Sequence, residues 1–173
     1  MKRGSIPTRI LARLGMLIAI SVVLKVFLSF TLADYRFTFY DIPLMVIGIM
    51  FGPLLGGLSG FIVDWLNIMY PNLATGFNLF TVSSILWGVI PGLLLFGRKD
   101  LSKFRLVIAV VITSLLTFSL NSVQLYLWMG AGMYGGLIPR IVTMCIKIPI
   151  QVFIIDVLYT RVLVFDLKLL KLR

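Results

Sequence analysis

Polar side chains recur at helical spacing in three apolar segments of the chain. Residues three or four positions apart share one face of a helix, so each series predicts a polar stripe. Amides pair with the edges of heterocycles, aromatic rings stack on their faces, and cations bind carboxylates. Together the stripes predict a cavity for a flat aromatic compound with an acidic tail. The three series are Asn78, Thr81, Ser84 and Trp87; Ser114, Thr117, Asn121, Gln124 and Trp128; and Arg140, Thr143, Lys147 and Gln151.

An alternative role for these stripes is hydrogen bonding between helices, which contributes about 1 kcal/mol per bond in a membrane. Amides and cations at matching depth on three segments favour a cavity. Trp128 ends its segment and also fits the aromatic belt of a membrane interface. Trp87 lies ten residues into its segment, about 15 Å along a helix, which is too deep for that belt. Trp87 therefore fits either core packing or an aromatic wall of the cavity.

The residue types that are missing exclude several kinds of catalytic site. The chain has no His and no Glu, one Cys and six Asp. Zinc sites of Cys and His, triads that need His, and disulfide frameworks are therefore excluded. A Walker-type phosphate loop is also missing, so energy from ATP must come from a partner. We predict no enzymatic activity, no cofactor and no metal.

The composition predicts an integral membrane protein. Of 173 residues, 60% are hydrophobic and 13% are charged, whereas a soluble domain has about 25% charged residues. One unit over residues 1–173 is expected at this length. The net charge of +10 could indicate nucleic acid, but most basic residues form three clusters that the positive-inside rule assigns to the cytoplasm. The clusters are Lys2, Arg3, Arg9 and Arg13; Arg98, Lys99, Lys103 and Arg105; and Arg161, Lys168, Lys171 and Arg173.

The positions of these clusters predict the topology. An even number of crossings must separate two cytoplasmic points, so the stretch 42–70 is expected to break at Gly52-Pro53 into helices 42–51 and 53–69. The result is an all-α fold of six transmembrane helices, with a short second helix and both termini in the cytoplasm. The apolar stretches run over 10–32, 42–70, 77–97, 106–129 and 137–165.

Three connecting segments are then expected on the outer side. Alternating polar and aromatic residues in 31–41 predict a short extended lid. Turn residues in 70–77 predict a loop, and the third segment, 130–139, is rich in glycine. The short helix 42–51 is only about 15 Å long, half of a hydrocarbon core, so it must be tilted or must line a cavity.

Four cations remain outside the basic clusters, and all of them lie on the outer side of the membrane or in its outer half. Ionisable residues in a membrane usually face a cavity or a charged partner. Ion pairs with Asp34, Asp41, Asp64 or Asp156 are one explanation, and an anionic ligand that arrives from outside is the other. Four cations that converge on one side favour the ligand. They are Lys25, Arg36, Arg140 and Lys147.

Small residues predict two close-packing faces. Gly52, Gly56 and Gly60 are four apart, and Asp64 follows one turn later, where it contacts either the ligand or a neighbouring helix. A second small face, on the first helix, lies away from that helix's polar residues and is available to another protein. It consists of Ala12, Gly15 and Ala19.

Motifs over nearly the whole chain resemble those of one transporter family. They are the small face Ala12, Gly15 and Ala19, the blocks Ile42-Pro43 to Gly48–Pro53 and Gly56–Asp64, Pro91-Gly92, and Pro139-Arg140 to Lys147–Gln151. The chain resembles the S components of energy-coupling factor (ECF) vitamin transporters. The resemblance implies a multi-pass protein of the bacterial cell membrane, with an outward-facing vitamin site under the loop between its first two helices. It also implies partners, namely a transmembrane T component and two cytosolic ATPases, besides membrane lipid.

Within this family, Gly76–Leu86 and Asn121–Trp128 resemble the folate-specific branch. Folate has a planar pterin and a dianionic glutamate tail, which agrees with the predicted cavity. Riboflavin, thiamine or pantothenate are alternative ligands, and a membrane enzyme or assembly factor acting on lipid precursors is the alternative class. Partner docking is expected at the small face of the first helix. The expected substrate-binding residues are Lys25, Arg36, Asp64, Asn78, Ser84, Trp87, Asn121, Gln124, Trp128, Arg140, Lys147 and Gln151.

Overall fold

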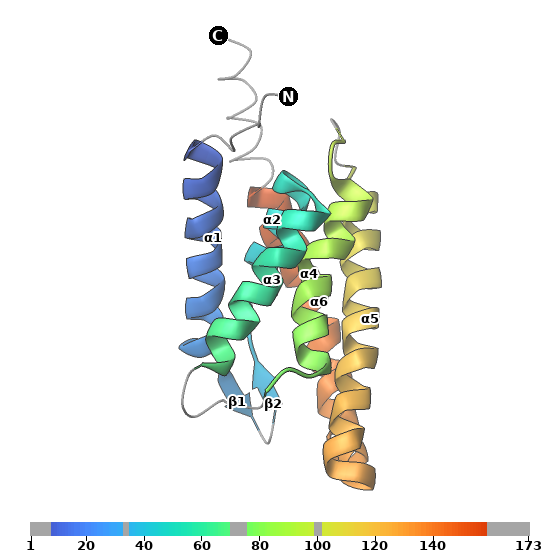
Figure 1. Ribbon diagram of the computed structural model, residues 1–173. Coiled ribbons are helices and arrows are strands. Elements are labelled where there is room, and N and C mark those ends of the chain that lie inside the picture. The colour runs from blue at the N-terminus through green and yellow to red at the C-terminus, as the bar shows by residue number, and fades with distance from the viewer. Residues whose placement is uncertain (1–7, 33–34, 70–75, 99–101, 159–173) are drawn as a thin grey trace.

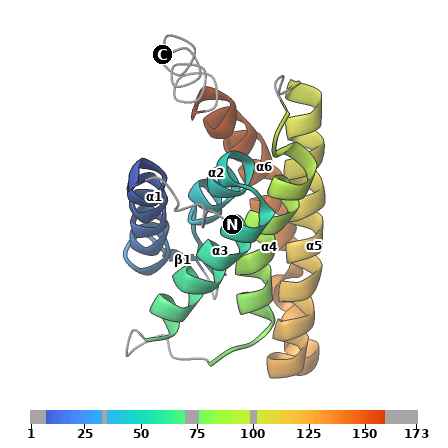
Figure 2. The ribbon, with the colours of Figure 1, turned by 45° about the horizontal axis from the view of Figure 1, so that its top comes forward.

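The computed structural model describes residues 8–32, 35–69, 76–98 and 102–158. In these ranges the chain forms a helical bundle, with α1 at one side and α5 at the other (Figures 1 and 2). The short 3-10 helix η1, Gly130–Gly136, joins the last two α-helices. The other elements are α1 (Thr8–Val26), β1 (Phe30–Leu32), β2 (Tyr35–Phe37), α2 (Asp41–Phe51), α3 (Pro53–Ile68), α4 (Leu79–Leu95), α5 (Lys103–Met129) and α6 (Leu137–Leu158).

The predicted break between α2 and α3 is confirmed. Gly52 has a φ of 93°, a conformation that favours glycine, and its amide closes α2 by a 3.0 Å bond to the Gly48 carbonyl. Pro53 then starts α3, a position at which its missing amide proton costs no hydrogen bond. The two short helices therefore follow from two adjacent residues.

The segment after α1 is extended, as the sequence predicts for the lid. β1 and β2 pair in an antiparallel hairpin in which Thr31 lies opposite Arg36. Figure 1 shows this hairpin at the same end of the bundle as the start of α6. Because residues 30–32 pair in the hairpin, α1 ends at Val26 and does not continue to 32.

The glycine-rich segment 130–139 is helical. The segment forms η1 and then continues into α6 from Leu137. Gly130, with a φ of 57°, ends α5 and lets the chain change direction. The loop expected at 70–77, except for 76–77, and the basic clusters within 1–7 and 159–173 lie outside the described residues.

Glycines bring α2, α3 and α4 into close contact. A Cβ atom at Gly56 of α3 would lie 2.5 Å from the carbonyl oxygen of Gly88 in α4, and one at Gly60 would overlap the carbonyl of Ser84. Gly48 of α2 packs against Gly88 in the same way. The close-packing face predicted for Gly56 and Gly60 is therefore confirmed, whereas Gly52 serves the break.

The described residues expose many large apolar side chains and bury many polar ones beside an apolar core, a combination that is rare in a water-soluble protein. Large apolar side chains cover the outside, for example Leu54, which is 76% exposed. By length and composition, one continuous helical stretch among the described residues, Lys103–Leu158, suffices to cross a membrane, and α2, α3 and α4 are shorter apolar helices. The buried polar residues are Ser21, Lys25, Asp41, Ser59, Asp64, Asn67, Thr81, Ser83, Ser84, Thr113, Ser114, Thr117, Gln124, Arg140 and Gln151.

Candidate functional site

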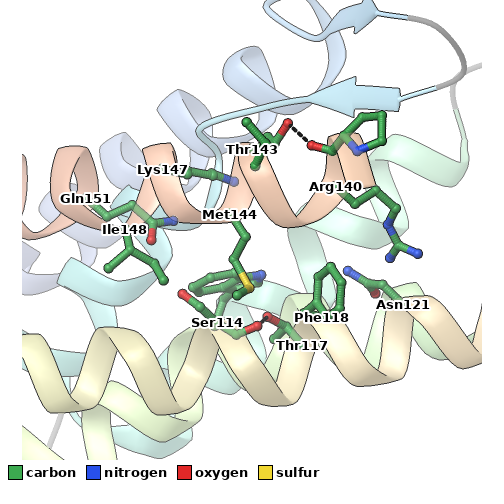
Figure 3. Close-up of a pocket in the computed structure, with 13 residues that line it drawn as sticks. Ser114, Thr117, Phe118, Asn121, Arg140, Thr143, Met144, Lys147, Ile148 and Gln151 are labelled. Carbon is green, nitrogen blue, oxygen red and sulfur yellow. Dashed lines mark hydrogen bonds between the residues drawn. The ribbon is translucent and has the colours of Figure 1, made fainter. Parts of the chain in front are cut away.

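A cavity of about 390 Å³ lies between α5 and α6, with Trp87 contributed by α4. This volume is within the range of small-molecule sites, about 300–1,000 Å³. The polar stripes predicted for 106–129 and 137–165 face each other across it (Figure 3). Its lining consists of Trp87, Ser114, Thr117, Phe118, Asn121, Pro139, Arg140, Val142, Thr143, Met144, Lys147, Ile148 and Gln151.

One end of the cavity, which we call the deep end, lies around Trp87, Lys147 and Gln151. The Lys147 ammonium is 2.9 Å from the Asp41 carboxylate and 5.8 Å from the centre of the Trp87 ring. Gln151 donates its amide N–H to the same carboxylate. Trp87 is buried, and among the described residues the Ser114 hydroxyl is a buried polar group without a hydrogen-bond partner. The deep end therefore combines an aromatic ring with groups able to bond a polar ligand edge.

The other end, which we call the outer end, contains Arg140 and Asn121. The Arg140 guanidinium lies over the Phe118 ring, 4.9 Å from its centre, in a cation–π contact. Asn121 accepts a 2.6 Å hydrogen bond from Ser83 of α4, which fixes its amide. Figure 3 shows Arg140 and Asn121 on facing helices at the end opposite Gln151. This end presents a cation and an amide to a ligand.

Three of the expected site residues form a separate buried cluster. Lys25 of α1 makes an ion pair with Asp64 of α3 and donates a 2.9 Å hydrogen bond to Ser84 of α4. Its ammonium also lies 4.4 Å from the centre of the Tyr40 ring. Desolvation raises the pKa of the Tyr40 phenol, so the phenol keeps its proton next to Ser84. These residues do not line the cavity; they join three helices to the segment that precedes α2.

Three more expected residues lie outside the cavity lining. Asn78 is the N-cap of α4, where its side chain accepts a 2.9 Å hydrogen bond from the Phe80 amide. Gln124 accepts a 3.1 Å hydrogen bond from the Leu79 amide and so ties α5 to the same helix start. Trp128 is 51% exposed and packs edge-on against Phe80. Arg36 belongs to β2, but its side chain is outside what the structure describes.

Sequence reasoning missed the apolar part of the lining and one acidic residue. Phe118 lines the cavity, and the sequence signal for it is that it directly follows Thr117 of the polar stripe. The sequence indicates Asp41 only as a possible ion-pair partner, and its signal is that it is a lone acid at the start of a buried apolar helix. Ser114, Thr117 and Thr143 were in the predicted stripes and line the cavity.

The small face of α1 is exposed along its length. Ala12, Gly15 and Ala19 all have exposed side-chain positions. A Cβ atom at Gly15 would have nothing within 4 Å. In the part of the chain that the structure describes, this face is therefore open, whereas Lys25 further along the same helix is buried.

The sequence matches the family model described as "ECF transporter, substrate-specific component" over residues 9–159. It is also 31% identical over 142 residues to the folate transporter FolT of Clostridium novyi (strain NT). That similarity covers 82% of this chain and 83% of the relative.

Solved structures with the same fold agree with this match. The structure of FolT bound with folic acid superposes with a TM-score of 0.77 at 27% identity, over 86% of this chain and 90% of that chain. The structure of the S component of a bacterial ECF transporter superposes with a TM-score of 0.67 at 23% identity, over 91% of this chain and 97% of that chain. The structure of the S component for biotin superposes with a TM-score of 0.66 at 18% identity, over 89% of this chain and 92% of that chain. At identities this low, these last two similarities concern the fold alone.

Proposed function

Because the chain belongs to the substrate-specific components of ECF transporters, we propose that its cavity binds folate from outside the cell. The proteins of this family are integral membrane proteins that serve transport and are not enzymes. The name of the Clostridium novyi relative supports folate as the ligand. So does the folic acid in the FolT structure.

The observation that carries this proposal is the different chemistry of the two ends of the cavity. Trp87, Gln151 and Ser114 at the deep end suit a flat heterocycle, which stacks on a ring and hydrogen-bonds at its edge. Arg140 and Asn121 at the outer end suit the carboxylates of the glutamate tail. Folate therefore matches the chemistry of both ends of the cavity when its pterin lies at the deep end and its glutamate at the outer end.

The expected binding residues then divide into two groups. Trp87, Asn121, Arg140, Lys147 and Gln151 are proposed to contact folate, because they line the cavity. The others are proposed to hold the helices around it, with Arg36 on the lid. The members of this second group are Lys25, Arg36, Asp64, Asn78, Ser84, Gln124 and Trp128.

The proposed membrane arrangement is a single unit of six transmembrane helices with both termini in the cytoplasm. The hairpin of β1 and β2 then faces outward and covers the site. A transmembrane T component and two cytosolic ATPases supply the energy, and docking uses Ala12, Gly15 and Ala19. The open surface at Gly15 supports this docking face.

Tryptophan fluorescence of the purified protein in detergent tests folate binding. Trp87 lines the cavity and Trp128 does not, so folate should quench the fluorescence without ATP or partners. Most of the quenching should disappear in Trp87→Phe and persist in Trp128→Phe, the matched control. Tighter binding of riboflavin or thiamine than of folate would contradict the proposal.

A further inference from the structure

Behind the cavity, one carboxylate holds two of the side chains that line it. Asp41, the first residue of α2, is fully buried. Its Oδ2 atom lies 2.9 Å from the Lys147 ammonium and accepts a hydrogen bond from the Gln151 amide nitrogen. Asp41 does not itself line the cavity. It can therefore act on a ligand without touching it, through Lys147, through Gln151 and through its charge.

The carboxylate determines which end of the Gln151 amide faces the cavity. Paired with the Lys147 ammonium, Asp41 is ionised, and an ionised carboxylate only accepts hydrogen bonds. Gln151 must therefore turn its NH₂ group toward Asp41, which leaves Oε1 for the ligand. Among the described residues, Gln151 Oε1 is buried and has no hydrogen-bond partner. Figure 3 shows it pointing toward α5, on the side where Ser114 lies.

The same carboxylate sets the charge of the deep end. Lys147 alone would place an uncompensated cation beside Trp87, from whose ring centre it is 5.8 Å away. The Asp41 carboxylate, whose Oδ2 atom is 2.9 Å from the Lys147 ammonium, balances this charge. A nearly neutral deep end favours an uncharged ring over a carboxylate, because a buried anion would meet no net positive charge there.

We propose that Asp41 is a positioning residue that makes Gln151 a hydrogen-bond acceptor in the cavity, so that the site selects rings with a donor at that edge. This inference rests on the proposed folate function. The 2-amino group of a pterin supplies such a donor. A ring with a carbonyl at the same position would direct a second acceptor at Gln151 Oε1, and both oxygens would stay unsatisfied.

The test compares the dissociation constants of folate and its 2-oxo analogue, in which a carbonyl replaces the exocyclic amine. The purified protein should prefer folate by about tenfold or more. In Asp41→Leu the acceptor is gone, so the Gln151 amide can present either end to the cavity and most of this preference should disappear. Asp41→Glu keeps an acceptor-only group and should retain the preference even where both affinities fall.

Two further variants separate positioning from general damage. Gln151→Met removes the amide acceptor without touching Asp41 and should also lower the preference, which tests the acceptor role even if Asp41→Leu does not fold. Asp156→Asn removes a carboxylate that pairs with Lys103 across 3.4 Å and lies outside the cavity lining, so it should change neither affinity nor preference.

The outcomes distinguish this inference from the function on which it rests. Equal weakening of both ligands in Asp41→Leu, with the preference unchanged, would mean that Asp41 is only structural. Equal binding of both ligands by the unaltered protein would also overturn the inference, while folate binding would stand. Binding of neither ligand by the unaltered protein would refute the proposed function itself.

Discussion

Arg140 and Lys147 carry the same charge in the same cavity, but their surroundings differ. Lys147 is paired with Asp41 at 2.9 Å, so its charge is already balanced. Arg140 lies at the outer end of the cavity, over the face of the Phe118 ring in a cation–π contact. We therefore expect Arg140 to contribute more than Lys147 to binding of the glutamate carboxylates.

Arg140→Ala tests this expectation. Folate binding should weaken by about 1.5–3 kcal/mol, the range for hydrogen bonds to charged groups. Pteroate, which lacks the glutamate, should lose far less. Calorimetric titration of both ligands against the detergent-purified variant measures the difference. If folate and pteroate lose the same binding free energy, Arg140 supports the structure of the site and does not bind the carboxylates.

The sequence predicted the residue types of the cavity better than their contacts. Helical spacing placed Asn121 and Arg140 on polar stripes, and both line the cavity. Spacing could not reveal that Lys25 pairs with Asp64, because that contact depends on which helices are neighbours. Nor could it distinguish a ligand contact from a helix cap at Asn78, since both need the same side chain.

At the scale of elements, the glycines of α2, α3 and α4 determine how closely these helices approach. Gly56 and Gly88 face each other with their backbones in contact. Such a contact has no room for even one methyl group, and over-packing costs about 1–3 kcal/mol. Trp87, which lines the cavity, precedes Gly88 directly on α4.

Gly56→Ala should therefore destabilise the protein by about 1–3 kcal/mol. Thermal unfolding in detergent without ligand measures the effect as a lower midpoint temperature. Gly15→Ala is the matched control, because a Cβ atom there has nothing within 4 Å, and its midpoint should not fall. Unchanged stability of Gly56→Ala would show that α3 and α4 can separate without cost.

Element boundaries were predictable where backbone chemistry dictates them. Gly52 and Pro53 marked the break between α2 and α3 because one allows a positive φ and the other favours a helix start. The 3-10 helix Gly130–Gly136 was not predictable, because glycines are as compatible with an open loop. The end of α1 at Val26 depends on hairpin pairing, which hydropathy does not encode.

At the scale of the whole molecule, α1 has two different sides. Ser21 and Lys25 are buried against the bundle, whereas Ala12, Gly15 and Ala19 are exposed. Contact with lipid alone does not require small residues, but a closely packed partner helix does. We therefore propose that the buried side holds α1 against the bundle and that the exposed small face docks the energising partner.

Gly15→Trp should block docking and spare binding. We expect nearly unchanged folate affinity in the isolated protein and loss of ATP-driven uptake in vesicles that contain the T component and both ATPases. Leu54→Trp, at a site on α3 that is 76% exposed, introduces the same side chain elsewhere and should preserve uptake. If Gly15→Trp abolished binding as well, the docking assignment would fail.

The short helix α2 also has a consequence for how the chain enters a membrane during synthesis. Its 11 residues span about 16 Å, too short for independent insertion as a transmembrane segment. Nine of them, Asp41–Ile49, are buried by other parts of the protein. Because Gly48 packs on Gly88 of α4, which is made later, α2 can reach its final position only after α4 has emerged from the ribosome. Insertion of the N-terminal half is therefore completed by a helix from the middle of the chain.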